Sequence, residues 1–461
     1  MIFSYLKSIS PLDGRYNKIT KGLRQIFSEY GFIKYRIMIE IFWLKYLSKI
    51  PEIPEISLDD DSNDILNNII KNFNLNDANQ IKNIEKYTNH DLKAIILFLE
   101  KKIKKIKNSK KIIGFIHFSC TSEDINNLAY ALMLKKAKEK YILIYWKKII
   151  KKMDYMAYKY RKNVILSRTH GQPATPSTIG KEIANFSYRL KRQMEQLKKI
   201  EILGKFNGAV GCYNAHVFAY PDLNWEKINR YFVESLNITW NPYTTQIEPH
   251  DYISEFLLCM FRFNTILIDF NRDIWGYISL KYFIQKINFR ETGSSTMPHK
   301  VNPIDFENSE GNLGISNALI QHFSSKLPIS RWQRDLSDST VLRNLGSIIS
   351  YSIISYHFNL IGINKIKVYK KNLLKDLKKN WEILLEPIQI TMKKMGIKNS
   401  YEKVKNLFRG KKVNYKILKK FIDNLKISDL EKYKLYNLTP FNYLGLSINL
   451  AKKINLYKYK F

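Results

Sequence analysis

The sequence is poor in cysteine and lacks the short motifs that most readily indicate a bound metal or nucleotide cofactor. Its three cysteines, Cys120, Cys212 and Cys259, are an odd number and form no CxxC pair. This argues against a disulfide scaffold or a zinc ribbon and suits a reducing cytoplasm, where we expect the protein to act. Neither a P-loop nor a GxGxxG fingerprint occurs. The histidines show no HExxH or His/Cys ligand spacing, so we predict no metal and no cofactor.

Segments typical of secretion or membrane insertion are also missing. Residues 1–7 contain no apolar h-region, so we expect no secretory signal. The longest uncharged stretch, residues 345–364, contains several serines, two asparagines, a histidine and two glycines. A lipid-facing span tolerates these residues poorly. We therefore predict a buried helix in a helical bundle there, and no membrane contact.

The composition that remains is that of a large globular chain with an excess of positive charge. With 461 residues, of which 45% are hydrophobic and 25% charged, about three ordinary domains are expected. The formal net charge of +35 has two interpretations. A basic protein can bind nucleic acid or a membrane surface. However, the lysines are scattered along the whole chain with many Ile, Asn and Tyr, whose codons are AT-rich, so we favour compositional drift and expect no specific nucleic-acid partner.

The apolar periodicity is helical almost throughout. From Ile179 to Leu197 the apolar residues follow one face of an amphipathic helix, with Thr175 as a predicted N-cap and Pro176 as the first helical residue. Residues 255–283 are apolar on nearly every side, as in a helix buried among other helices. Convincing strands are scarce. We predict an all-α (mostly α) fold with three helical domains and a long central helix bundle, separated near lysine-rich runs: 1–111, 112–364 and 365–461.

The segment with the most chemistry is Gly293-Ser294-Ser295-Thr296-Met297-Pro298-His299-Lys300-Val301-Asn302-Pro303. It indicates a glycine-started loop with several hydroxyls, then a lysine, then the start of a helix. Asn302 can cap that helix, and Pro303 can occupy its first position. The positive end of the helix, together with Lys300, would attract a carboxylate or phosphate.

This segment resembles the GSSxMPxKxNP hallmark of the fumarase/aspartase superfamily, whose members release fumarate by β-elimination. Residues 121–127 and 167–174 resemble the other two conserved regions of that superfamily, in the expected order. Four further segments are similar to the longer bacterial form of the adenylosuccinate lyase family: residues 10–16, 88–91, 241–250 and 330–335. The resemblance extends over essentially the whole chain and weakens toward the lysine-rich C-terminus.

The resemblance implies a purine-biosynthesis reaction that splits a C–N bond. Adenylosuccinate would give AMP and fumarate, and succinyl-aminoimidazole carboxamide ribotide would give aminoimidazole carboxamide ribotide and fumarate. Ser294 matches the family's general base, which needs nearby positive groups to stabilise its alkoxide. His170 matches the general acid, a role that suits an imidazole at neutral pH. Glu307 matches a carboxylate that pairs with this histidine, and His90 a histidine near the phosphate and leaving group.

The resemblance also assigns substrate-binding residues and an assembly. Phosphate- and ribose-side contacts are matched by Arg15, Tyr16, Arg334, Ser339 and Arg343, since the planar guanidinium suits phosphate. The remaining matched positions would surround the purine, the scissile bond and the succinyl carboxylates: Asn89, His90, Asp91, Thr121, Ser122, Gln246, Ser295, Lys300, Val301, Asn302, Asn308, Thr340, Val341 and Leu342. The implied assembly is a homotetramer whose active sites are shared between subunits.

Purely structural roles for several of these residues, and other functions for the protein, remain open at this point. Asn89, Asp91, Thr121 and Ser122 could serve only as helix caps, and Glu307 could be a surface charge. Another lyase of the superfamily, such as fumarase, argininosuccinate lyase or aspartate ammonia-lyase, would not need arginines for a nucleotide phosphate. A non-catalytic, basic nucleic-acid-binding protein would not need Ser294, His170, Lys300 and Glu307 together.

Overall fold

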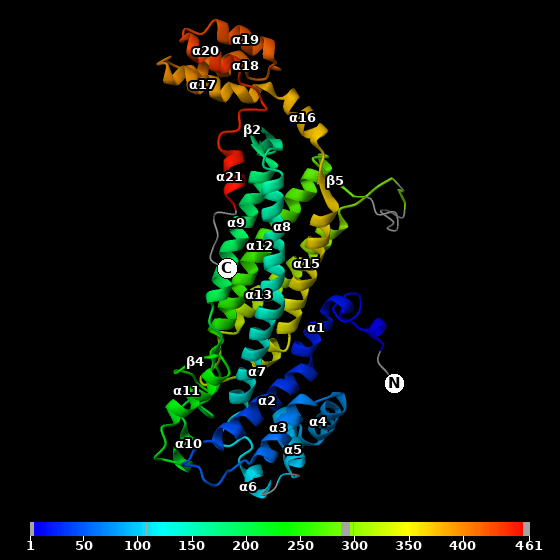
Figure 1. Cartoon of the computed structure of the whole chain (residues 1–461), viewed down its shortest axis with the longest axis vertical. Helices are drawn as coiled ribbons and strands as arrows, with labels where there is room; N and C mark the ends of the chain where they lie inside the picture. Colours follow the sequence, from blue (N-terminus) through cyan, green and yellow to red (C-terminus); the bar gives the residue numbers. More distant parts are fainter. Residues whose placement is uncertain (1–3, 105, 107–108, 287–295, 298, 455–461) are drawn as a thin grey trace. The chain divides into compact units, whose positions relative to one another are not determined.

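The computed structural model describes residues 4–104, 106, 109–286, 296–297 and 299–454, and these residues are mostly helical (Figure 1). The predicted all-α class is therefore confirmed. The chain divides into two compact units. Unit 1 comprises Met1–Tyr145, Gln196–Thr265 and Gly311–His357, and unit 2 comprises Trp146–Glu195, Ile266–Glu310 and Phe358–Phe461. The division of the chain into three sequential domains stays a prediction.

Five long helices contribute residues to both units, because the division falls within each of them. They are α8 (Leu143–Lys159), α9 (Ile179–Lys199), α12 (Asp251–Ser279), α13 (Ile304–Lys326) and α15 (Leu345–Lys365).

The other elements belong to one unit each. Unit 1 contains η1 (Tyr5–Lys7), α1 (Asn17–Phe27), α2 (Glu29–Leu47), α3 (Asp60–Lys71), α4 (Leu75–Thr88), α5 (Asp91–Ile103), α6 (Ser109–Gly114), α7 (Ser122–Ala137), the π-helical turn η2 (Lys138–Ile142), α10 (Asn214–Ala219), α11 (Trp225–Ser235), α14 (Ser337–Leu342) and the parallel strands β3 (Leu203–Gly204) and β4 (Thr239–Trp240). Unit 2 contains the antiparallel pairs β1 (Val164–Thr169) with β2 (Gln172–Thr178) and β5 (Phe283–Gln285) with β6 (Ile366–Val368), and then α16 (Lys370–Lys379), η3 (Trp381–Leu384), α17 (Leu385–Lys394), α18 (Ser400–Phe408), α19 (Tyr415–Asp423), α20 (Asp429–Tyr436) and α21 (Ser447–Lys453).

Helix α9 confirms the predicted apolar face but begins later than expected. Ile183, Phe186 and Leu190 are buried on that face. The predicted N-cap and first residue, Thr175 and Pro176, lie instead in strand β2, so that prediction was wrong. They lie at a register shift of the hairpin, and the pairing of Ala174 and Ser177 with β1 on either side keeps the chain between them extended. The cap is supplied by Thr178, whose Oγ1 accepts the Lys181 N–H at 3.2 Å.

Helix α15 contains the uncharged stretch and is buried as predicted. Within unit 1 its polar side chains meet partners on neighbouring helices. Ser352 Oγ accepts a hydrogen bond from Asn264 Nδ2 at 3.1 Å, and Tyr356 donates to Asn264 Oδ1 at 2.6 Å. These contacts satisfy polar groups that would otherwise be costly to bury. Within the described ranges, no helix combines the length and apolarity needed to cross a membrane.

Candidate active site

A pocket of about 420 Å³ in unit 1 collects many of the residues to which the family resemblance assigns substrate contacts. It lies among α2, the turn between α4 and α5, the first turns of α7 and the segment around α14. Its lining residues are Phe32, Arg36, Glu85, Asn89, His90, Asp91, Ser122, Asn126, Tyr130, Arg334, Leu336, Ser339, Thr340 and Arg343. The wall therefore combines guanidinium groups with carboxylates and two aromatic rings.

The turn between α4 and α5 serves both as a helix cap and as pocket wall. Asn89 closes α4 in the left-handed conformation, with φ of 48°. His90 is the N-cap of α5, and its Nδ1 accepts the Lys93 N–H at 3.2 Å. His90 is thus the N-cap of α5 and Asn89 the C-cap of α4, whereas Asp91, the other capper considered from the sequence, is the first residue of α5. Because His90 also lines the pocket, the capping role does not exclude substrate contact.

Asp91 connects two arginines across the pocket. Its Oδ2 lies 2.8 Å from Nη2 of the buried Arg36 and 3.4 Å from Nη2 of Arg343. Burial alone would raise the pKa of Asp91, but the charge and hydrogen bond of Arg36 outweigh burial and lower it. Asp91 therefore stays anionic and fixes both guanidinium groups.

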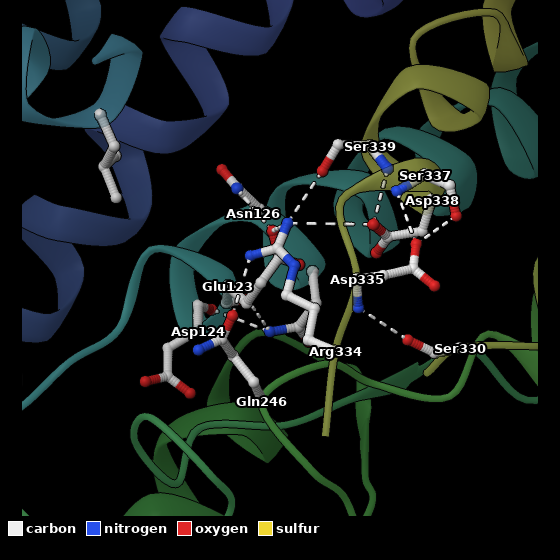
Figure 2. Close-up of polar contacts among 12 residues, drawn as sticks. Glu123, Asp124, Asn126, Gln246, Ser330, Arg334, Asp335, Ser337, Asp338 and Ser339 are labelled. Carbon is white, nitrogen blue, oxygen red and sulfur yellow. Dashed lines mark hydrogen bonds and ion pairs between the residues drawn. The ribbon is translucent and has the colours of Figure 1, made fainter. Parts of the chain in front are cut away.

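Arg334 is the centre of a polar network that joins three distant parts of unit 1 (Figure 2). Its Nη1 donates to Gln246 Oε1 at 3.1 Å, and its Nη2 donates to Glu123 Oε1 at 3.1 Å and to Ser339 Oγ at 2.9 Å. Glu123 is almost fully buried, whereas Arg334 keeps 16% of its side-chain exposure. Arg334 is thus held in one orientation and still reaches the pocket.

The fully buried carboxylate of Asp124 holds the start of α7 in place. The Thr121 N–H donates to Asp124 Oδ2 at 2.8 Å, and Asp124 Oδ1 lies 2.8 Å from Lys205 Nζ. The same carboxylate accepts the backbone N–H groups of Asn207 and Gly208. Ser122 is consequently presented at a rigid helix N-terminus, the kind of site that attracts anions.

A buried histidine connects the loop that carries Gln246 to the segment that carries Arg334. His250 Nε2 lies 3.2 Å from Asp338 Oδ2, and the His250 N–H donates to Glu248 Oε2 at 2.7 Å. Burial would raise the pKa of Asp338, but His250 and the charge of Arg334 lower it. Gln246 is fixed further by its Nε2, which donates to Ala209 O at 3.1 Å.

His170 lies in unit 2, at the tip of the β1–β2 hairpin. His170 and Gly171 form the two-residue turn, with φ of 52° and 75°. Positive φ at both central residues is typical of the tightest hairpin turns. This hairpin was not predicted, because the dipeptide His-Gly is not among the common turn signals. His170 is exposed to solvent at this turn.

The other candidate residues of unit 2 belong to the segment 293–303 and to α13. Ser294 and Ser295 lie outside the described residues. Helix α13 begins at Ile304, one residue later than predicted, and the Pro303 carbonyl before it accepts the Phe306 N–H at 3.1 Å. Lys300 is exposed, and Val301 O accepts a hydrogen bond from Gln285 Nε2. Asn302 and Asn308 are half-buried.

Glu307 lies on an exposed part of the first turns of α13, and its Oε1 accepts a hydrogen bond from Trp275 Nε1 at 3.0 Å. Its pairing with His170 stays a prediction.

Four of the predicted site residues do not line this pocket: Arg15, Tyr16, Val341 and Leu342. Arg15 is exposed in the turn before α1, with its guanidinium carbon 6.0 Å from the centre of the Tyr16 ring. Leu342 is buried in α14, and Val341 precedes it. The structure therefore does not bring these four residues to the pocket wall of unit 1.

Several pocket residues were missed from the sequence. Arg36 is 2% exposed, and within the described residues its Nε and Nη1 have no hydrogen-bond partner. The guanidinium carbon of Arg36 lies 3.7 Å from the centre of the Phe32 ring. Tyr130 was also missed. In the sequence Arg36 and Tyr130 each look like an ordinary residue of an amphipathic helix, so no local signal distinguishes them. Glu123, which orients Arg334 without lining the pocket, was not chosen as a site residue although it lies in the family-like segment 121–127.

Comparisons with known proteins identify the family of this chain. Residues 14–316 match the Lyase family, and residues 330–444 match the adenylosuccinate lyase C-terminal family. The chain is 59% identical to adenylosuccinate lyase of Buchnera aphidicola subsp. Acyrthosiphon pisum, over 98% of this chain and 100% of the relative. It is 54% identical to adenylosuccinate lyase of Escherichia coli K12, with the same shares covered.

Among solved structures, the fold is similar to a fumarate lyase from Mesorhizobium sp. BNC1. That comparison has a TM-score of 0.77 and 14% identity, over 95% of this chain and 98% of the other. That similarity concerns the fold alone, whereas the family models and the relatives show that this chain belongs to the adenylosuccinate lyase family.

Proposed function

We propose that this protein splits the C–N bond of adenylosuccinate to give AMP and fumarate, and acts in the same way on succinyl-aminoimidazole carboxamide ribotide. The observation that carries the proposal is the pocket of unit 1, which gathers His90, Ser122, Arg334, Ser339 and Arg343. These groups suit a substrate with a phosphate, carboxylates and an aromatic base. Relatives named adenylosuccinate lyase, at 54–59% identity over almost the whole chain, support the same reaction.

In this reaction a base removes a proton from the succinyl carbon beside a carboxylate, and an acid protonates the departing nitrogen. We assign the first step to Ser294 and the second to His170. The exposed His170 at a tight hairpin tip suits a group that must approach a substrate bound elsewhere. Lys300, Asn302 and Asn308, together with the N-terminus of α13, would stabilise the carboxylate that becomes an aci-anion. Arg15, Tyr16, Arg334 and Arg343 would bind the phosphate and ribose.

The direct test is incubation of the purified protein with adenylosuccinate, with separate assays for fumarate and AMP. Argininosuccinate and aspartate serve as control substrates, because they carry no nucleotide phosphate. Release of fumarate from a control substrate, but not from adenylosuccinate, would contradict the assignment. In the Arg15→Ala variant, unimpaired activity on adenylosuccinate would contradict phosphate binding by that residue.

The roles of the two catalytic residues are tested by Ser294→Ala and His170→Ala. Ser294→Ala should abolish turnover while substrate binding remains measurable, and His170→Ala should slow turnover and move the acidic or basic limb of a bell-shaped pH–rate profile. We also propose that the protein acts as a cytoplasmic homotetramer with shared active sites. Mixing the Ser294→Ala and His170→Ala variants should then give more activity than either variant alone, because some sites would receive an intact Ser294 and an intact His170 from different subunits. A monomeric mass in solution, or no restoration after subunit exchange, would contradict this assembly.

A further inference from the structure

The hairpin that carries His170 needs support from outside itself. A two-stranded ribbon alone is marginally stable. His170 is also held at a φ of 52°, a backbone conformation that non-glycine residues adopt only when their surroundings fix it. The orientation of the imidazole therefore depends on whatever holds strands β1 and β2.

Strand β1 is held by Arg168, which lies two positions before His170 and contacts Tyr282 and Asp376. Arg168 Nη1 donates to the Tyr282 hydroxyl at 2.7 Å, and Arg168 Nη2 lies 2.5 Å from Asp376 Oδ2. The Tyr282 hydroxyl also donates to Asp376 Oδ2, which closes the triangle. Arg168 and Asp376 keep only 27% and 26% of their side-chain exposure, so solvent screens the pair less than a fully exposed one.

Strand β2 has its own contact with the C-terminal helices. Thr175 Oγ1 donates to Glu386 Oε2 of α17 at 2.5 Å. Beneath the polar contacts, Leu166 of β1 is 1% exposed and belongs to the same apolar core as Leu377 and Leu384. Each strand of the hairpin is thus attached to helices that lie about 200 residues further along the chain.

We propose that the C-terminal helices α16 and α17 position the general acid, and that Arg168, Asp376 and Tyr282 are the positioning residues. The inference rests on the proposed function, because it assumes that His170 protonates the leaving nitrogen. Asp376 orients Arg168, which fixes the end of β1 and with it the turn that presents the imidazole. Proton transfer demands a defined approach, and a displacement of about 1 Å can lower the rate by roughly 100-fold.

The main test is the Asp376→Ala variant, assayed on adenylosuccinate. We expect kcat to fall at least about tenfold, while KM changes less than about twofold, since the variant displaces the acid without altering the pocket of unit 1. Asp376→Glu, which keeps a carboxylate, should recover most of the loss. Tyr282→Phe, which removes one hydroxyl and is the mildest change, should lower kcat by a smaller factor.

The matched control is Asp423→Ala. Asp423 also accepts a hydrogen bond from a tyrosine, Tyr436, within the C-terminal helices, and among the described residues no hydrogen bond or ion pair joins it to the hairpin. Its loss should lower thermal stability and leave kcat unchanged. Hydrogen exchange of residues 164–178 gives a second readout, which should accelerate in Asp376→Ala and not in Asp423→Ala.

The outcomes distinguish a failure of the positioning role from a failure of the proposed function. Wild-type kcat in Asp376→Ala, or an equal loss of kcat in both variants, would overturn the positioning role. Unchanged hydrogen exchange of the hairpin in Asp376→Ala would do the same. A wild-type protein that releases no fumarate would instead overturn the proposed function, and the positioning role would fall with it.

Discussion

The ammonium of Lys205 lies 2.8 Å from the carboxylate of Asp124, and neither side chain is exposed to solvent. Asp124 also accepts three backbone N–H groups, from Thr121, Asn207 and Gly208. Lys205 donates further to Gly208 O at 3.0 Å. The residue before α7 and the loop after β3 are thus held together by one buried ion pair, whose removal has predictable consequences.

Replacing Lys205 by methionine should destabilise unit 1 strongly. The change leaves Asp124 buried without its countercharge, and breaking such a pair typically costs about 3–5 kcal/mol. Urea denaturation at neutral pH measures the loss. Arg230→Met provides the control, because Arg230 forms an exposed pair with Glu234. Surface pairs contribute at most about 1 kcal/mol. Similar losses in the two variants would contradict the importance of burial.

Replacing Arg334 by alanine should weaken substrate binding more than it affects the chemical step. Its guanidinium is held towards the pocket by Glu123, Gln246 and Ser339. Losing hydrogen bonds between charged groups costs about 1.5–3 kcal/mol, so KM should rise roughly 10- to 100-fold. The control is Arg331→Ala, three residues away, whose side chain is 82% exposed. An unchanged KM in Arg334→Ala would exclude a substrate contact.

His216 should make the protein less stable in acid. Burial lowers its pKa to about 4, whereas an unfolded histidine titrates near ~6.5. Between these two values the unfolded chain takes up a proton that the folded protein excludes. The free energy of unfolding should therefore fall as the pH drops from about 6.5 to about 4, by on the order of 3 kcal/mol. Urea denaturation across this range should show a weaker dependence in His216→Gln.

His117 should have the opposite effect. Burial alone would lower its pKa, but the hydrogen bond and charge of Glu40, whose Oε1 lies 2.7 Å from Nδ1, outweigh burial and raise it. A raised pKa contributes stability that is complete below the unfolded value and is lost as the pH rises through the folded value. Stability measured from pH 6 to 9 should therefore decline less in His117→Gln than in the wild type. An identical decline in both proteins would contradict the pairing with Glu40.

Gly211→Ala should distort the loop that carries Gln246. Gly211 has a φ of 83°, and an added Cβ would lie 2.4 Å from the Thr244 carbonyl oxygen. Backbone strain of this kind costs about 1–3 kcal/mol, and the displaced loop should lower kcat/KM. Gly276→Ala is the matched control, since a Cβ there meets no atom within 4 Å. Within helix α12 that change should leave activity intact and leave stability equal or slightly higher.

Local patterns in the sequence were sufficient for the helical class, the apolar face of α9 and the buried α15. They failed where a tertiary contact overrides the local preference. Thr175 and Pro176 have the residue types of a helix start, yet they lie in strand β2 because the residues on either side of them, Ala174 and Ser177, pair with β1. The motifs indicated the family because each of them is a run of specific residue types at neighbouring positions, which can be recognised without the tertiary structure.

The sequence alone determined the family, the helical character and most of the residues around the pocket, because periodicity and motifs depend on neighbours only a few positions apart. Only the tertiary structure decided that Arg334 meets Glu123, 211 residues away, that the buried Arg36 faces the pocket, and that Asp376 reaches the hairpin of His170. Such side chains have the same sequence pattern whether they face solvent or a binding site. Their partners are selected by packing of the whole unit, which no local pattern contains.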